Sequence, residues 1–364
     1  MKLLQEKQTV WQRLQQEKRP IILYGMGDGA QKILNVFADF GIQITDIFAS
    51  DEFVRGHSFV GIRVKKLSEI RELYPDFIIV LGFASQRPEV LEKFYQLDDQ
   101  YDVVAPDVPV AGGDLFDLDF FQAHQREIEQ AYDLWADERS REIYRATLNY
   151  KISGKLCYLR NFTDAKEEAF TQLLKPGKNE RFLDLGAYNG DTIRELLSYT
   201  GGAYASIAAL EPDEKNFRKL KAYAEENLTG DVKLVHAAAW NQAETLEFSV
   251  RAGRNSALGS RKGKSVPGAT VDAVLQGAPV TMMKMDVEGS EKQALEGARE
   301  TICRWKPRLN LALYHRNEDL FALPLQLESM CPGYRFYLRH HPYVPSWDTN
   351  LYGVHPKMEE SICY

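Results

Sequence analysis

A glycine-containing turn follows an apolar run in the second half of the chain, in the segment FLDLGAYNGDT at 182–192. The run at 182–185 has the composition of a buried strand, and a helix is expected to begin near Asp191. Gly186 and Gly190 let the backbone turn tightly and approach a ligand without a Cβ in the way. Ligands of open α/β sheets bind where strands end in such turns. The segment therefore predicts a nucleotide-type binding loop, although a tight turn without a ligand could use the same residues.

An acidic residue, Glu211, ends the next apolar run in the segment AALEPD. A carboxylate at this position can accept hydrogen bonds from both hydroxyls of a ribose. Dinucleotide sites share this arrangement, but their turn reads G-x-G-x-x-G, whereas this one reads G-A-Y-N-G. S-adenosylmethionine has no pyrophosphate and needs no such cradle, so it is favoured over a nicotinamide dinucleotide. The alternative for Glu211 is a surface carboxylate that caps the helix expected near Pro212.

Further polar residues end another apolar run, in the segment VTMMKMDVEGSEKQALEGA at 280–298. Side chains alternate on a strand, so Lys284 and Asp286 share one face. Asp286 stands at the carboxyl end of the strand and Glu288 lies in the turn just beyond it, where an α/β enzyme presents polar groups to its substrate. Ser290 is expected to cap the following helix. The alternative for Lys284 is a structural Lys–Asp pair that satisfies buried polar groups.

His315 follows the apolar run at 309–313 and is the candidate general base, because a histidine commonly titrates near neutral pH. It is expected to lie beside Asp286, since the fifth strand of such a sheet ends next to the fourth. A histidine hydrogen-bonded at a strand end is the alternative. Asp286, Glu288 and His315 could also converge on a metal, but no ligand spacing requires one, and no metal is predicted. His340 and His341 are predicted at the surface or at the rim of the substrate site.

The elements that must position these residues form an α/β pattern. Strands are expected at 182–185, 206–210, 232–237, 280–285 and 309–313, with helices between them, which predicts a parallel sheet. A final pair at 335–338 and 350–352 is separated by HHPYVPSWDT, which is too short for a helical crossover, so these two strands should be antiparallel. The prediction is a seven-stranded, mostly parallel sheet with an antiparallel final hairpin, which is the class I methyltransferase plan.

Several of these segments together resemble the FkbM family of methyltransferases: LDLGAYNGDT, EPDEKNF, the run Thr270-Val271-Asp272, KMDVEGSE, LALYHRNEDL and YRFYLRHH. The resemblance covers residues 182–352. It implies a class I fold that uses S-adenosylmethionine and O-methylation of hydroxyls on natural products or glycans. Many members place an acidic residue after the fifth strand, where this chain has Tyr314-His315.

The resemblance and the turn chemistry together give a predicted site. The expected cofactor-binding residues are Asp184, Gly186, Ala187, Tyr188, Gly190, Asp191, Thr192, Glu211, Pro212 and Ala238. The expected catalytic residues, facing the transferred methyl group, are Asp286, Glu288 and His315.

The N-terminal region shows a second strand–helix alternation, with strands expected at 21–24, 44–48 and 77–81. Its turn YGMGDGA places Gly25, Gly27 and Ala30 in a G-x-G-x-x-A pattern, and Asp51 follows the second strand, which is a weak Rossmann fingerprint. No catalytic residues of a dehydrogenase are visible nearby, so a degenerate or substrate-binding domain is favoured over a nicotinamide site. Residues 116–150 lack glycine and proline and predict a helical connector. The predicted domains are 1–106, 107–178 and 179–364.

The composition of the chain indicates which partners and which cellular compartment are expected. The chain has 364 residues, 44% hydrophobic and 27% charged, with a net charge of −7, which argues against a nucleic-acid partner. The one basic cluster, 251–264, is short and predicts a solvated loop or a local clamp for an anionic substrate. Four cysteines without metal-ligand spacing suggest a reducing compartment. No signal peptide or membrane-spanning segment is recognisable, so a cytoplasmic protein without membrane insertion is expected.

The leading hypothesis is an S-adenosylmethionine-dependent O-methyltransferase that acts on a small-molecule or carbohydrate-like acceptor. An N-methyltransferase is the nearest alternative. A non-catalytic nucleotide-binding or scaffold protein with two Rossmann-like domains is an alternative from another class, and a nicotinamide oxidoreductase rests on the N-terminal glycines alone. The sequence is compatible with a homo-oligomer.

Overall fold

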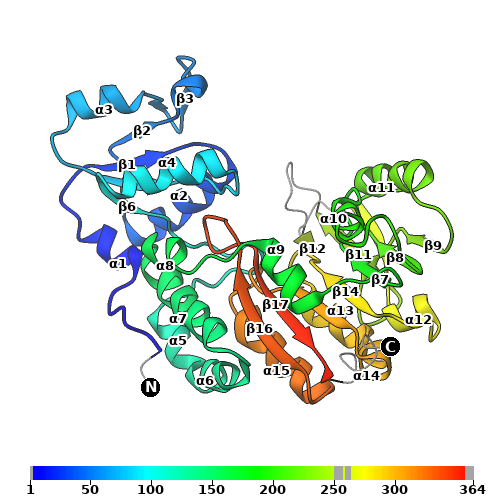
Figure 1. Ribbon diagram of the computed structural model, residues 1–364. Helices are drawn as coiled ribbons and strands as arrows, with labels where there is room; N and C mark the ends of the chain where they lie inside the picture. Colours follow the sequence, from blue (N-terminus) through cyan, green and yellow to red (C-terminus); the bar gives the residue numbers. More distant parts are fainter. Residues whose placement is uncertain (1–2, 250–256, 259–263, 357–364) are drawn as a thin grey trace.

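The computed structural model describes residues 3–249, 257–258 and 264–356 (Figure 1). Two separate sheets of mostly parallel strands lie at opposite ends of the molecule, with a group of helices beside them. The predicted α/β fold class is confirmed.

The larger sheet has the strand order β16-β17-β15-β14-β7-β8-β9. Its strands are β7(Arg181–Leu185), β8(Ser206–Leu210), β9(Val232–Val235), β14(Met282–Met285), β15(Arg308–Ala312), β16(Arg335–His340) and β17(Thr349–Val354). Strands β7, β8, β9, β14 and β15 run parallel, and β17 pairs antiparallel with both β15 and β16. The predicted seven strands and their antiparallel final pair are confirmed.

Helices cover both faces of this sheet because alternate strand residues point to opposite sides. Phe182 packs with α10(Asp191–Thr200) and α11(Glu214–Asn227). Leu183 and Leu185 pack with the helices of the other face, α13(Glu291–Gly297), α14(Arg299–Trp305) and α15(Asp319–Met330). The helix α12(Val271–Leu275) also contributes to this second core. The carboxyl ends of the strands are left open between the two helical layers.

The smaller sheet is fully parallel, with the order β2-β1-β5-β6. Its strands are β1(Ile21–Tyr24), β2(Asp46–Phe48), β5(Ile78–Leu81) and β6(Asp102–Val104). The helices of this region are α1(Val10–Gln15), α2(Asp28–Phe40), η1(Asp51–Phe53), α3(Leu67–Leu73) and α4(Pro88–Asp98). The short strand β6 and the hairpin β3(Ser58–Phe59)–β4(Ile62–Arg63) were not predicted.

The connector is helical, as predicted, and it contributes to both cores. Its helices are α5(Leu118–Ala123), α6(Gln125–Leu134), α7(Glu138–Ser153), α8(Cys157–Arg160), α9(Lys166–Glu168) and η2(Ala169–Leu174). Helix α7 buries Tyr144 and Ile152 in the core of the larger sheet and Tyr150 in the core of the smaller one. Val344, from the segment between β16 and β17, also lies in the smaller core. The domain boundaries at 106 and 178 stay a prediction.

A small additional sheet with the order β10-β13-β11-β12 was not predicted. Its strands are β10(Ala238–Ala239), β11(Glu244–Ser249), β12(Ala257–Leu258) and β13(Lys264–Ala269). Most of the basic cluster at 251–264 lies outside the described residues. Cys157, Cys303 and Cys331 are free thiols, and Cys363 is outside the described part. Within the described ranges, no helix has the length and apolar character that a bilayer-spanning segment needs.

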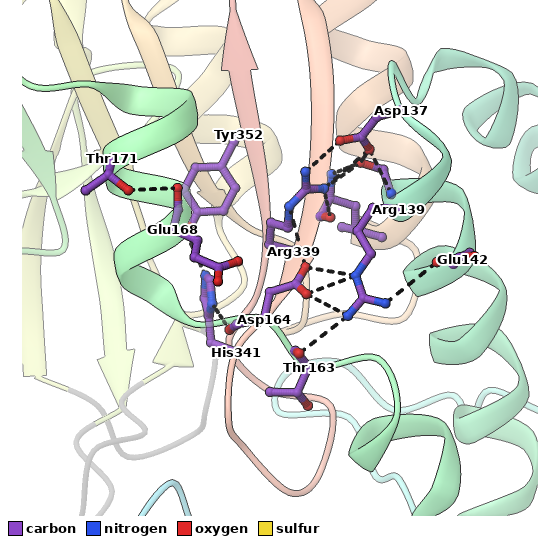
Figure 2. A network of polar contacts seen from close by, with 12 residues as sticks. Asp137, Arg139, Glu142, Thr163, Asp164, Glu168, Thr171, Arg339, His341 and Tyr352 are labelled. Carbon is purple, nitrogen blue, oxygen red and sulfur yellow. Dashed lines mark hydrogen bonds and ion pairs between the residues drawn. The ribbon is translucent and has the colours of Figure 1, made fainter.

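A polar network joins the connector to β16 (Figure 2). Arg339 on β16 donates to Asp137, just before α7, at 2.6 Å, and its Nε lies 3.5 Å from Asp164. Arg139 donates to the same Asp164 carboxylate at 2.6 Å. The Arg339 and Asp164 side chains are 14% and 13% exposed, so water screens these pairs only partly. The network therefore fixes where the connector meets the edge of the large sheet.

We expect Arg339→Ala to lower the free energy of unfolding by about 1–3 kcal/mol, because the partly buried Asp137 and the more deeply buried Asp164 lose a charged partner. Chemical denaturation followed by circular dichroism measures the change. The matched control is Arg218→Ala, which removes an exposed pair within α11 and should cost less than about 0.5 kcal/mol. Equal losses in the two variants would mean that the network does not stabilise the fold.

Candidate active site

A cavity opens at the carboxyl ends of β7, β8, β14 and β15, where open α/β sheets bind ligands. Most of the predicted site residues line it: Gly186, Tyr188, Asp191, Thr192, Glu211, Pro212, Ala238, Asp286, Glu288 and His315. Asp184, Ala187 and Gly190 do not. Ala187 is fully buried beneath the loop, and Gly190 approaches Leu220 and Tyr223 of α11. The structure thus brings ten of the thirteen predicted site residues to one cavity.

Gly186 is required by its neighbour within the protein. Its φ is +82°, and a Cβ there would lie 1.9 Å from the backbone oxygen of Asp286. The Lys284 ammonium donates to the Gly186 carbonyl at 2.9 Å, which holds the turn after β7 against the end of β14. This contact explains the glycine more directly than the expected approach of a ligand.

Asp184 lies beneath the loop. It is fully buried, neither carboxylate oxygen has a hydrogen bond, and Lys284 Nζ is 3.6 Å away. Burial raises the pKa of Asp184 to about 6, against the opposing effect of Lys284. Lys284 itself would lose charge through burial, but Asp184 and Asp286 outweigh that effect and raise its pKa. Lys284 is therefore a structural cation, as in the alternative reading, and its closer carboxylate is Asp184.

Glu211 is a buried carboxylate, 5% exposed, and not the surface residue of the alternative reading. One oxygen accepts from the Tyr188 amide at 2.7 Å and the other from the Asp213 amide at 2.8 Å. A carboxylate offers about four acceptor positions, so each oxygen keeps one free lone pair at the cavity. Burial raises the pKa of Glu211 to about 7. The helix that follows is capped instead by Asp213, which accepts from the Asn216 amide at 2.9 Å.

His315 is 1% exposed and lies among three carboxylates. Its Nδ1 is 2.8 Å from Glu291, while its Nε2 is 3.3 Å from Asp286 and 3.5 Å from Glu288. Burial alone would lower the pKa of His315, but Glu291 foremost, with Glu288 and Asp286, raises it to about 10. The ring is therefore an imidazolium at neutral pH, which contradicts the expectation of a histidine that titrates near neutrality.

The two carboxylates at the cavity differ in character. Burial would raise the pKa of Asp286, but Lys284 and His315 outweigh it, so its pKa is lowered and it stays charged. Glu288 is farther from these cations, and burial raises its pKa to about 7. At neutral pH Glu288 can therefore gain or lose a proton, whereas Asp286 keeps its charge.

Asp286, Glu291 and His315 come close enough together to suggest a metal site. However, Asp286 faces Nε2 of the ring and Glu291 faces Nδ1, so one ion could not bind the ring and both carboxylates. The arrangement fits a protonated imidazole between acidic partners better than a metal centre with these three ligands.

Backbone strain marks the same cavity. Tyr188, Glu288 and Asp348 have φ values of +47°, +56° and +59°, and all three line the cavity. A non-glycine residue in the left-handed region costs on the order of 1–3 kcal/mol, and such strain is concentrated at functional sites. Three residues that line the cavity thus have a backbone conformation that costs the fold stability.

Three local expectations are wrong. Ser290 does not cap α13, because its hydroxyl donates to the Val287 carbonyl at 2.7 Å. His340 and His341 are each 1% exposed, and neither lines the cavity. His340 bonds Thr349 at 2.9 Å, and His341 bonds the Tyr352 hydroxyl at 2.7 Å (Figure 2 shows the second pair). Both histidines serve the packing of the final hairpin.

One side of the cavity was missed by the sequence analysis. Its residues come from distant parts of the chain: Gln86, Val110, Lys166, Asn310, Tyr343, Trp347, Asp348 and Asn350. Tyr343 and Trp347 have ring centroids 5.7 Å apart, and Asn350 donates to Asp348 at 2.6 Å. No motif joins these residues, although the aromatic segment between β16 and β17 was a visible signal.

Two of the N-terminal glycines, Gly25 and Gly29, have an internal explanation, whereas a Cβ on Gly27, whose φ is +106°, would meet no atom within 4 Å. A Cβ on Gly25 would lie 2.3 Å from the ring of Phe83, and a Cβ on Gly29 would lie 2.9 Å from the Gly82 carbonyl. The ring of Phe83 thus lies directly against the turn after β1, where a dinucleotide would place its phosphates. This packing agrees with a domain that does not serve as a nicotinamide site.

Comparison with known proteins gives a consistent result. Residues 184–344 match the methyltransferase FkbM domain. The crystal structure of methyltransferase FkbM from Methylobacillus flagellatus KT superposes with a TM-score of 0.73 at 21% identity, covering 93% of this chain and 90% of that one. No match was found among curated proteins.

Two further solved structures overlap about half of the chain. Precorrin-6y C5,15-methyltransferase from Geobacter metallireducens GS-15 has a TM-score of 0.33 at 12% identity and covers 50% of this chain and 83% of its own. Fibrillarin from Aeropyrum pernix, with natively bound S-adenosyl-L-methionine, has a TM-score of 0.35 at 14% identity. That match covers 52% of this chain and 72% of the fibrillarin chain.

The FkbM match falls on the larger sheet and its cavity, and the resemblance inferred from the sequence is confirmed. The chain therefore carries a methyltransferase FkbM domain at residues 184–344.

Proposed function

We propose that this protein uses S-adenosylmethionine to methylate a hydroxyl group on a sugar, a glycan precursor or a similar small molecule. The observation that carries the proposal is the charge of the cavity. Six carboxylates line it, from Asp191, Glu211, Asp213, Asp286, Glu288 and Asp348, against three cations, Lys166, Lys284 and the His315 imidazolium. Such a cavity favours a ligand with positive charge and disfavours a pyrophosphate.

The residues at the β7 and β8 ends fit this cofactor. Glu211 would accept from the ribose hydroxyls with the lone pairs that its two backbone donors leave free. Tyr188 and Pro212 would flank the nucleoside, since both line the same part of the cavity. When bound, S-adenosylmethionine would supply a methyl group on a sulfonium: an acceptor oxygen would bond to the methyl carbon as the carbon–sulfur bond breaks, leaving a neutral thioether.

Glu288 is the proposed general base, in place of His315. It lies at the cavity with its side chain 29% exposed, and its strained backbone holds it there. An acceptor hydroxyl would pass its proton to the Glu288 carboxylate while its oxygen takes the methyl group. His315 would then hold Asp286 and Glu288 in place as an imidazolium, anchored from behind by the fully buried Glu291.

An uncharged hydroxyl acceptor suits the opposite side of the cavity. Tyr343 and Trp347 offer aromatic faces, and Asp348, Asn310 and Asn350 offer hydrogen-bonding groups. This combination matches a polyhydroxylated ring, which has both apolar C–H faces and hydroxyl edges. The carboxylates at the transfer point would repel an anionic acceptor.

The first test concerns Glu211. We expect Glu211→Gln to weaken the binding of S-adenosylhomocysteine about tenfold or more, because a charged acceptor of ribose hydrogen bonds is lost. Wild-type affinity should also fall by about tenfold from pH 8 to pH 6, because the ligand requires the ionised form of a group with a pKa of about 7. Isothermal titration at several pH values measures both effects. Glu211→Gln should show a flat pH profile, and an unchanged affinity in that variant would place the ribose elsewhere.

The second test concerns the base. Glu288→Gln should reduce kcat by a factor of about 10²–10⁴, because proton removal is lost. The affinity for S-adenosylhomocysteine should stay unchanged. Wild-type turnover should rise with pH through about 7, as Glu288 loses its proton. Labelled methyl transfer to a panel of sugars and sugar derivatives gives the assay. Full turnover in Glu288→Gln would exclude it as the base.

The third test concerns His315. A pKa raised from 6.5 to about 10 on folding stabilises the protein fully below pH 6.5, and this contribution is lost as pH rises through 10. We expect His315→Gln to lower the free energy of unfolding by about 3–5 kcal/mol at pH 7, because three carboxylates lose their shared cation. Urea unfolding at pH 7, 8.5 and 10 should show a deficit that shrinks toward pH 10. A deficit that is constant with pH would mean that the ring is neutral.

A further inference from the structure

The N-terminal sheet presents its carboxyl edge to the methyltransferase cavity. Ser85, in the loop between β5 and α4, exchanges two backbone hydrogen bonds with Val344, at 2.8 and 3.0 Å. Val344 lies in the segment between β16 and β17 that also carries Tyr343 and Trp347. Figure 1 shows this segment, in red, reaching up toward the N-terminal sheet. Ser85 is 8% and Val344 0% exposed, so the bridge is part of the interior.

A second anchor lies after β6. The Ala111 amide donates to the His315 carbonyl at 2.9 Å. Lys151 of α7 joins Asp107 at 2.6 Å and Asn317 at 3.1 Å, with both charged side chains at least 96% buried. The ends of β5 and β6 are therefore each tied to a segment that forms the cavity.

These anchors place two side chains from the N-terminal part at the cavity, Gln86 and Val110. Gln86 directly follows the bridging Ser85, so the position of its backbone is fixed by the bridge. Its side chain is exposed, and its carboxamide makes no hydrogen bond to other described residues. A carboxamide both donates and accepts, which suits hydroxyl groups.

We propose that the loop after β5 completes the acceptor site and that Gln86 is a specificity-determining residue for the acceptor. The inference rests on the proposed function, since it names a further part of the same site. It gives the N-terminal sheet a role: the edge that binds nucleotides in other α/β sheets here forms the wall of a neighbouring cavity. The acceptor would contact Gln86 and the Tyr343–Trp347 pair along this wall, with its reacting hydroxyl toward Glu288.

Uncharged methyl hexopyranosides serve as probes, because they carry the hydroxyls and C–H faces expected of the acceptor. Full-length protein saturated with S-adenosylhomocysteine is titrated with methyl α-glucopyranoside, α-galactopyranoside and α-mannopyranoside, and binding is followed by saturation-transfer NMR. We expect at least one glycoside to bind. Gln86→Ala should lower the affinity for that glycoside about threefold to tenfold, as expected for one lost hydrogen bond. Trp347→Ala should lower the same affinity at least as much.

The matched control is Gln96→Ala, an exposed glutamine on α4 that does not line the cavity, and it should bind like the wild type. All variants should bind S-adenosylhomocysteine within about twofold of the wild type. Equal glycoside affinity in Gln86→Ala and the wild type would overturn the proposal, as would the absence of glycoside binding or its persistence in Trp347→Ala. Failure to bind S-adenosylhomocysteine in the wild type would instead refute the proposed function.

Discussion

The buried ammonium of Lys284 is the contact on which the site depends. It donates to the carbonyl of Gly186, lies 3.6 Å from Asp184 and lies 3.9 Å from Asp286. It thereby joins three strand-end features: the turn after β7, the acid beneath that turn and the acid at the end of β14. Because a buried charge is tolerated only with partners, each of these groups constrains the position of the others. The two halves of the cavity are connected through this one side chain.

His315 plays the corresponding role on the side of the cavity where we propose that the acceptor binds. Its ring separates Glu291, in the interior, from Asp286 and Glu288 at the cavity. The cation allows acidic groups to gather at the cavity. Lys284 and His315 together lower the pKa of Asp286, whereas burial raises the pKa of Glu288 to about 7. The two carboxylates of one motif thus differ in pKa because the cations outweigh burial at Asp286 but not at Glu288.

The sequence predicted the large sheet and most of one wall of the cavity, because these depend on local pattern. Apolar runs of four to six residues, such as that ending at Leu185, identify buried strands, and the residues that follow them lie at the carboxyl edge by topology. The prediction was weaker where side chains meet from distant segments. The charge state of His315 depends on Glu291, and the far wall depends on Gln86 meeting Trp347. The sheet formed by β10 to β13 was missed because its strands are short or only partly apolar.

The shared cores have a consequence for how the protein is made. Leu3 and Leu4 are buried with residues of the larger sheet, such as Leu351, while Val344 is buried in the smaller core. During synthesis Leu3 and Leu4 would therefore leave the ribosome long before the strands of the larger sheet with which they share a core. The small sheet, although complete by Val104, would expose apolar surface until the last hairpin arrives. A nascent N-terminal half should accordingly be a good client for chaperones, and a chain truncated near residue 340 a good substrate for proteases.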